Sequence, residues 1–152
     1  MRVGIRLGLV LCCGLVLSSC AGLPLVLTPS SHLKIQAEDG TWVACDIYDK
    51  GRPRVVIISP GFLQHKRSPG IRELIALLQS DFDVIALDYR GTGDSSGKYA
   101  YSAKEHADLH AVLQFAERRW ARVGVVGISL GAAIAINELA EHPHAHSLVT
   151  IS

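Results

Sequence analysis

The chain has few cysteines and no large excess of charge of either sign. Both features limit the classes of protein to which it can belong. Its 152 residues carry 15 basic and 14 acidic side chains. Nucleic-acid binding therefore has no electrostatic support, because it requires a basic surface. Of four cysteines only Cys45 lies beyond residue 20, so no intrachain disulfide is expected there and Cys45 is predicted to be a small core residue. The chain also lacks internal repeats and low-complexity segments, and its length allows at most one globular domain.

The amino end lacks acidic residues and has the layout of a secretory signal. No charged side chain occurs between Arg6 and Lys34. Two arginines precede an uncharged, leucine-rich stretch at 7–17, and small residues then lead to Cys20. This order of basic, apolar and small residues predicts a signal peptide over 1–19.

Leu17-Ser18-Ser19-Cys20 resembles the lipobox of bacterial lipoproteins, in which the cysteine thiol receives a diacylglyceryl group and becomes the first residue after cleavage. The resemblance implies a lipidated tether over 20–31 and membrane attachment through Cys20. An uncleaved membrane anchor is the alternative, because about 20 apolar residues can span a bilayer. Ala21, rather than aspartate, follows the cysteine. In a Gram-negative cell this would imply sorting to the outer membrane.

Beyond the tether, strand-like and helix-like segments alternate. Apolar and polar residues alternate on both sides of Asp39-Gly40, which predicts a β-hairpin. Short continuous apolar runs then predict buried strands. The expected strands are 32–37, 41–48, 54–59, 83–88, 122–126 and 147–151, and the expected helices are 71–78, 102–120 and 132–141. Ser102 and Glu105 are expected to form a capping box at the start of the second helix. The order predicts a mostly parallel sheet with helices on both faces.

The segment Gly127-Ile128-Ser129-Leu130-Gly131 lies directly between the apolar run at 122–126 and the alanine-rich stretch at 132–136. It therefore predicts a strand, a sharp turn and a helix around one serine. The two glycines suit a turn in which sheet and helix pack closely on both sides of a strained serine. Such a turn presents Ser129 at the tip of the sheet as a nucleophile. An ordinary glycine-bearing turn is the alternative.

This order of elements, with the serine turn after the fifth strand, resembles the α/β-hydrolase fold. The similarity covers roughly residues 32–152, which correspond to the amino-terminal half of such a domain. The segment at 88–95 also resembles the loop after the fourth strand in hydrolases of the serine aminopeptidase and monoacylglycerol lipase type. The resemblance implies that Ser129 is the nucleophile and that the backbone N–H of Leu130 is one oxyanion donor.

A second oxyanion donor is implied in the loop after the third strand, at 59–62. Pro60 has no N–H, so Phe62 is the first candidate and Gly61 the alternative. Many members of the family have His-Gly where this chain has Pro60-Gly61.

A serine nucleophile also needs a base that is itself oriented by a carboxylate. In the family both follow the serine in the sequence. The ionisable candidates after Ser129 are Glu138, Glu141, His142, His144 and His146. All are expected at the far end of the helix that starts at the serine. Residues 32–152 are therefore expected to lack the triad aspartate and histidine and to be inactive alone.

Other polar clusters are assigned structural roles. The spacing in His142-Pro143-His144-Ala145-His146 suggests metal ligands, but without a further acidic or thiol ligand nearby a solvent-facing loop is expected, and no metal or cofactor is predicted. The glycines at 91–97 do not match a dinucleotide site, because no acidic residue follows on a second strand. His65, His106 and His110 are expected to be surface or helix-face residues, and Asp88 and Asp94 to serve turns and caps.

The sequence thus predicts a membrane-attached serine hydrolase that cleaves a small ester or another acyl substrate through an acyl-serine. Esterase, lipase, other acyl-hydrolase and peptidase-like activities fit this prediction equally. The alternative is a lipoprotein that uses the same fold as a noncatalytic binding or interaction module.

Overall fold

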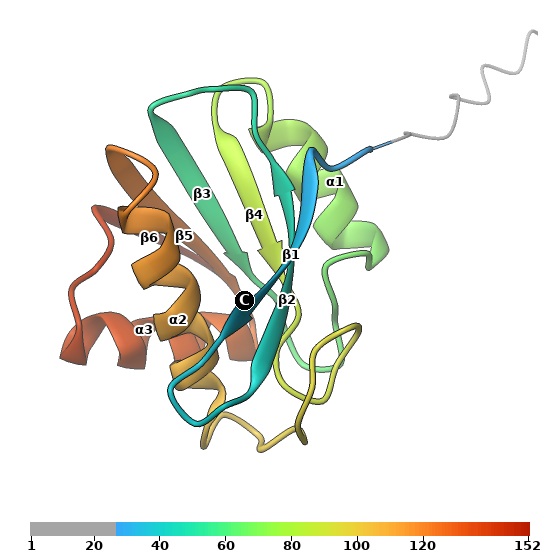
Figure 1. The fold of residues 1–152 in the computed structure, drawn as a ribbon, viewed down its shortest axis with the longest axis vertical. Coiled ribbons are helices and arrows are strands. Elements are labelled where there is room, and N and C mark those ends of the chain that lie inside the picture. The colour runs from blue at the N-terminus through green and yellow to red at the C-terminus, as the bar shows by residue number, and fades with distance from the viewer. Residues whose placement is uncertain (1–26) are drawn as a thin grey trace, which may run out of the picture.

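A computed structural model describes residues 27–152, which form one sheet with helices on both faces (Figure 1). The predicted signal peptide and Cys20 lie outside the described residues. The strands are β1 (Ser31–Gln36), β2 (Trp42–Tyr48), β3 (Arg54–Ser59), β4 (Asp83–Leu87), β5 (Arg122–Ile128) and β6 (Ser147–Ile151), and the helices are α1 (Pro69–Leu78), α2 (Glu105–Glu117) and α3 (Leu130–Glu141). Within 27–152, no helix combines the length and the apolar character needed to cross a bilayer.

The strands lie in the order β1-β2-β4-β3-β5-β6. Most neighbouring pairs are parallel, as predicted. Strands β1 and β2 form the expected hairpin, and β2 pairs antiparallel with β4. The remaining pairs, β4–β3, β3–β5 and β5–β6, are parallel. The chain leaves β3 for β4 on one side and later returns to β5 on the other. Ligands of open α/β sheets bind beyond the carboxyl ends of strands at such a reversal, which here lies at the ends of β3 and β5.

The two faces of the sheet carry separate cores because successive strand residues point to opposite sides. Ile57 belongs to a core built with α2 and α3, whereas its neighbour Ile58 packs with α1. Cys45 is buried in the first core, as predicted, and its burial raises the pKa of the thiol. Helix α2 contributes the predicted apolar face to the same core, with Leu109, Val112, Leu113 and Ala116 all buried.

The folded domain begins earlier than the predicted end of the tether. Leu27 is buried and packs with Tyr48 and Ile58 in the α1 core. The backbone N–H of Ser30 donates to the carbonyl of Ile47 over 2.7 Å, and β1 follows directly. Leu27 and Ser30, which the sequence placed in the tether, therefore already pack and bond with the domain.

The capping box predicted at Ser102 does not form. Helix α2 begins at Glu105, its N-cap is Lys104, and no side chain caps it. Ser102 instead has a positive φ of 77° within a turn. The Glu105 carboxylate accepts the N–H groups of Ala100, over 2.6 Å, and Lys104, over 3.3 Å. The carboxylate therefore stabilises the turn before the helix, and the N-cap lies two residues later than predicted.

A buried arginine ties the loop after β4 to α2 and to the first hairpin. The guanidinium of Arg90 binds both carboxylate oxygens of Asp108, with its shortest contact at 2.6 Å, and both side chains are almost fully buried. The backbone N–H of Arg90 donates to the same carboxylate over 2.8 Å. Arg90 also donates to the half-exposed Asp39 over 2.6 Å.

Asp39 gives this network a pH dependence. The hydrogen bond from Arg90 is the main reason that the pKa of Asp39 falls from 3.8 to about 2. A carboxyl whose folded pKa is depressed stabilises the fold above its unfolded pKa, and the stabilisation is lost as the pH falls toward the folded value. Asp39→Asn should therefore be less stable than the wild type at pH 5, and the difference should shrink toward pH 2. Denaturant unfolding at both pH values measures it, with the exposed Glu38→Gln as control.

Candidate active site

Ser129 stands at a strained turn between β5 and α3. Its φ of 49° and ψ of −116° lie outside the helical region, and it is the N-cap of α3. Its backbone N–H donates to the carbonyl of Ile151 over 2.7 Å, and its carbonyl accepts the N–H of Ala132 over 2.9 Å. The side chain is exposed. Non-glycine residues are held in such conformations only where the surrounding structure enforces them, and such sites are often functional.

The two glycines of the motif are required by close packing. A Cβ on Gly131 would lie 2.3 Å from the carbonyl oxygen of Ser59, at the end of β3. A Cβ on Gly127 would lie 2.6 Å from the Cα of Ala132, in the first turn of α3. Both contacts are with backbone, which cannot move aside without shifting the strand or the helix. The glycines therefore let α3 start immediately against the sheet, as the sequence pattern predicted.

A buried hydrogen-bond chain fixes the end of β3 against this turn. The Ser59 hydroxyl donates to the carbonyl of Gly131 over 2.8 Å, so the Tyr89 hydroxyl, 2.6 Å away, donates to Ser59. Burial raises the pKa of Tyr89, which keeps this donor protonated. The chain links β3, β4 and α3 at the carboxyl ends of the strands.

The loop after β3 packs against Ser129 at Gly61. A Cβ built on Gly61 would lie 3.4 Å from the Cβ of Ser129, so the two residues are adjacent. The N–H of Gly61, the alternative oxyanion donor, donates to the side chain of Gln64 over 2.8 Å. The N–H groups of Phe62 and Leu130 take part in no hydrogen bond within residues 27–152. This difference favours Phe62 over Gly61 as the partner of Leu130.

The loop after β4 folds around the buried carboxylate of Asp88. Asp88 accepts the backbone N–H of Lys66 over 2.7 Å and that of Asp94 over 2.8 Å. The Lys66 ammonium binds both Asp88 and Asp94. The two aspartates thus have the loop-organising role that the sequence predicted. The backbone N–H of Asp94 in this loop donates to a carboxylate of the chain itself. This arrangement argues against a site for the phosphate groups of a dinucleotide there.

None of the candidate bases reaches Ser129 within the described residues. The Ser129 hydroxyl makes no hydrogen bond to any residue of 27–152. Glu138, Glu141 and the histidines at 142–146 lie at the opposite end of α3, as predicted. His65 lies in the loop after β3, where its ring accepts the N–H of Arg67 over 3.2 Å. The histidines near the end of α3 do not simply face solvent: His142 lies 3.3 Å from the buried Glu138.

The aromatic ring of Phe62 packs with two tyrosines, Tyr99 and Tyr101, that no sequence pattern indicated. The ring of Phe62 lies 5.7 Å from that of Tyr99 and 6.0 Å from that of Tyr101. Tyr99 packs against the core, whereas Phe62 and Tyr101 are exposed. The cluster joins two loops that are 37 residues apart between Phe62 and Tyr99, so no local pattern could have revealed it.

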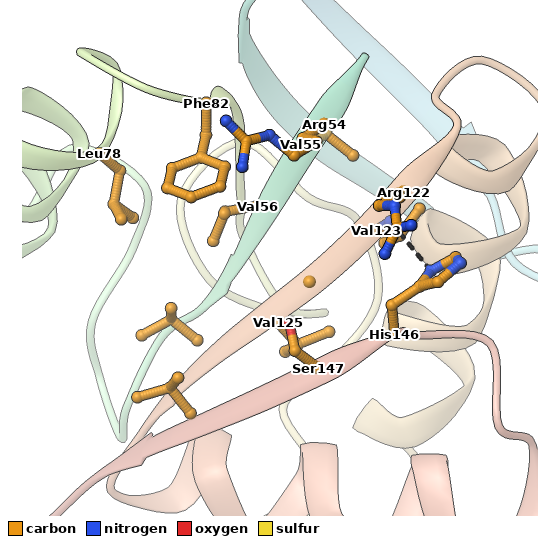
Figure 2. A pocket seen from close by; sticks show the side chains of 13 residues that line it. Arg54, Val55, Val56, Leu78, Phe82, Arg122, Val123, Val125, His146 and Ser147 are labelled. Carbon is orange, nitrogen blue, oxygen red and sulfur yellow. Dashed lines mark hydrogen bonds between the residues drawn. The ribbon is translucent and has the colours of Figure 1, made fainter. Parts of the chain in front are cut away.

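A groove of about 390 Å³ lies elsewhere, on the face of the sheet that carries α1 (Figure 2). Arg54 and Arg122, from the first residues of β3 and β5, line it together with Phe82. The groove is therefore centred toward the amino ends of these strands, whereas Ser129 follows the carboxyl end of β5. The groove is therefore not a substrate pocket beside Ser129.

Solved structures similar to this chain are α/β hydrolases, the class that the sheet and the serine turn define. The esterase Pf2001 of Pyrococcus furiosus is 29% identical with a TM-score of 0.73, over 78% of this chain and 49% of that one. The XC6422 serine hydrolase of Xanthomonas campestris, described as lacking a lid, is 20% identical with a TM-score of 0.69, over 84% of this chain and 63% of that one. The esterase EaEST of Exiguobacterium antarcticum is 23% identical with a TM-score of 0.67, over 79% and 44%. The last two similarities concern the fold alone.

Residues 51–152 match the sequence profile of serine aminopeptidase, S33. The chain therefore belongs to this family of α/β hydrolases. It spans about half the length of the Pyrococcus furiosus esterase, at 49%. No curated protein matches it.

Proposed function

We propose that the protein is a serine hydrolase in which Ser129 attacks an ester or another acyl bond. The hydroxyl oxygen adds to the substrate carbonyl, the leaving group departs with a proton, and water then hydrolyses the acyl-serine. The observation that carries the proposal is the strained, exposed Ser129 at the start of α3, with Gly61 of the loop after β3 packed against it. An aligned oxyanion donor contributes about 2.7–4 kcal/mol of transition-state stabilisation.

The base and its carboxylate come, in this proposal, from outside residues 27–152. The chain covers 49% of the Pyrococcus furiosus esterase, and in the family both groups follow the serine in the sequence. Without them, oxyanion donors and substrate binding give only about 10³–10⁴-fold catalysis over water. The described residues would then supply the nucleophile and the oxyanion donors but not the proton transfer.

The aromatic cluster favours a substrate with an apolar group. The exposed rings of Phe62 and Tyr101 stand beside the proposed oxyanion donor. Aromatic side chains provide large apolar contact areas, and pairs of them favour offset or edge-to-face packing. An esterase or lipase acting on an apolar acyl or alcohol group fits this surface better than a hydrolase of small charged substrates.

Labelling with a fluorescent fluorophosphonate tests the proposal on the protein purified from its native gene. The phosphonate reacts with an activated serine hydroxyl, so the wild type should be labelled and Ser129→Ala should not. Ser147→Ala, which removes an exposed serine of β6, is the matched control and should be labelled fully. A folded wild type that stays unlabelled would favour the noncatalytic binding module instead.

We also propose that a lipid on Cys20 holds the protein at a membrane, the outer membrane in a Gram-negative cell. Buried acyl chains contribute about 0.8 kcal/mol per methylene, so two or more chains give a stable anchor. Metabolic labelling with palmitate in a bacterial host should mark the wild type, which should sediment with membranes. Cys20→Ser should lose the label and the membrane association. A membrane-bound but unlabelled Cys20→Ser variant would support the uncleaved anchor.

A further inference from the structure

Histidines from separate elements meet at the end of α3 that is remote from Ser129. His110 on α2 places Nδ1 2.6 Å from Oε1 of Glu138 on α3. His142, which follows α3, places Nδ1 3.3 Å from the same oxygen. The rings of His110 and His142 are 4.7 Å apart. We refer to His110, Glu138 and His142 as the histidine–glutamate cluster.

Glu138 is the unusual member of this cluster. Its side chain is 1% exposed, and its Oε2 has no hydrogen-bond partner among residues 27–152. Burying a carboxylate without full compensation is costly. A bound cation would satisfy this oxygen. No acidic ligand was expected near His142, but the fold places Glu138 beside it, together with His110.

The cluster has the donor set and spacing of a transition-metal site. One ligand atom from each of the three residues can be chosen so that all lie within 4.8 Å of one another. Bonds of about 2.0–2.1 Å in a tetrahedron put ligand atoms about 3.3 Å apart, a spacing that small side-chain rotations would produce here. Two imidazoles and one carboxylate suit Zn²⁺ and related ions, whereas Mg²⁺ and Ca²⁺ prefer oxygen ligands.

Neighbouring groups are arranged to support the ligands. Nδ1 of His144 lies 2.9 Å from the carboxylate of Glu117, which would leave Nε2 of His144 available. Its ring is 5.3 Å from that of His110. The side-chain amide of Gln114 lies 2.8 Å from Nε2 of His110. Metal-bound histidines usually hold their second ring nitrogen in such a hydrogen bond.

The cluster also borders an open space. A cavity of about 180 Å³ is lined by His106, His110, Glu138, Glu141 and His142, among others. A water molecule occupies about 30 Å³ in the liquid, so the cavity has room for a solvent ligand and a path of entry. His144 or a water would complete a four-coordinate ion.

We propose that the histidine–glutamate cluster binds one Zn²⁺ or a similar transition-metal ion that joins α2, α3 and the segment leading to β6. In the metal-free protein, Nδ1 of neutral His110 donates to Glu138 and Nε2 accepts from Gln114. When Nδ1 becomes a ligand, the imidazole proton moves to Nε2, and Gln114 turns its carbonyl oxygen to accept it. The ion is structural, because α3 separates it from Ser129, and the inference does not depend on the proposed hydrolase activity.

Metal titration of the full chain, purified without a polyhistidine tag, tests the proposal. Isothermal titration should give one Zn²⁺ per chain, and the melting temperature should rise with Zn²⁺ because only the folded state presents the site. Mg²⁺ and Ca²⁺ should produce neither effect. With Co²⁺ in place of Zn²⁺, the intense visible absorption of a four-coordinate ion should appear.

Two variants locate the site. His142→Ala changes an exposed residue after the helix and should lower the Zn²⁺ affinity at least 10-fold, and Glu138→Gln should lower it at least as much. His32→Ala is the control, because His32 pairs with Asp46 on the edge of the sheet formed by β1 and β2, and it should bind as the wild type does. Absence of stoichiometric Zn²⁺ binding, or binding unchanged in folded His142→Ala, would overturn the proposal.

Discussion

Replacement of Ser129 by alanine should lower the rate of ester hydrolysis by about 10⁶-fold, the loss seen when the nucleophile of a serine hydrolase is removed. The substitution deletes one exposed oxygen and leaves the glycines that shape the turn in place. No acyl-enzyme can then form, although the amides of Phe62 and Leu130 remain. The measurement is kcat/KM for an activated ester with a short acyl chain, using the protein produced from its native gene.

Two comparisons isolate the chemical effect from loss of structure. Ser129→Ala should melt close to the wild-type temperature, because its side chain makes no hydrogen bond within the described residues. Ser147→Ala should retain full activity. A Ser129→Ala variant that is folded and still hydrolyses the ester at the wild-type rate would rule out the acyl-serine mechanism.

Replacement of Asp108 by asparagine should destabilise the fold by about 3–5 kcal/mol, the cost of breaking a buried ion pair by removing one partner. The Asp108 carboxylate accepts hydrogen bonds from the side chain and the backbone N–H of Arg90. An asparagine has only one acceptor oxygen, so its amide nitrogen would face an N–H donor of Arg90. The buried guanidinium would also lose its main counter-charge.

The free energy of unfolding in urea measures this effect, with Arg118→Gln, just beyond the end of α2, as the control. The control should change the stability by less than about 0.5 kcal/mol, as surface substitutions usually do. Equal stability of Asp108→Asn and the wild type would show that the buried pair is not important for the fold.

The fold was largely predictable because its strands carry a local signal. The four residues at 55–58 are all apolar and buried, and they lie in β3 at the centre of the sheet. The serine turn was predictable for the same reason, since its glycines are adjacent in sequence to the strand and the helix that they separate. The start of α2 was not, because the Glu105 carboxylate bonds to the turn before it instead of completing a capping box with Ser102. Ser102 has a positive φ and lies in the turn instead of at the N-cap of α2. Composition does not reveal this backbone conformation.

The site was predictable only in part, because most of its contacts join distant segments. The sequence singled out Phe62 and Gly61 together, and only the hydrogen bond from Gly61 to Gln64 distinguishes them. The histidine–glutamate cluster left a partial signal, since Glu138 and His142 are one helical turn apart. His110 is 28 residues from Glu138, and its role follows from the packing of α2 on α3.

A crystal structure of the fluorophosphonate-treated protein would show whether Ser129 is the nucleophile that faces the two amides. Phosphorus should be bonded to Oγ of Ser129, with one phosphonyl oxygen about 2.7–3.1 Å from the backbone nitrogens of both Phe62 and Leu130. Phosphorus on a different side chain, or a phosphonyl oxygen that points into solvent away from both amides, would contradict this prediction.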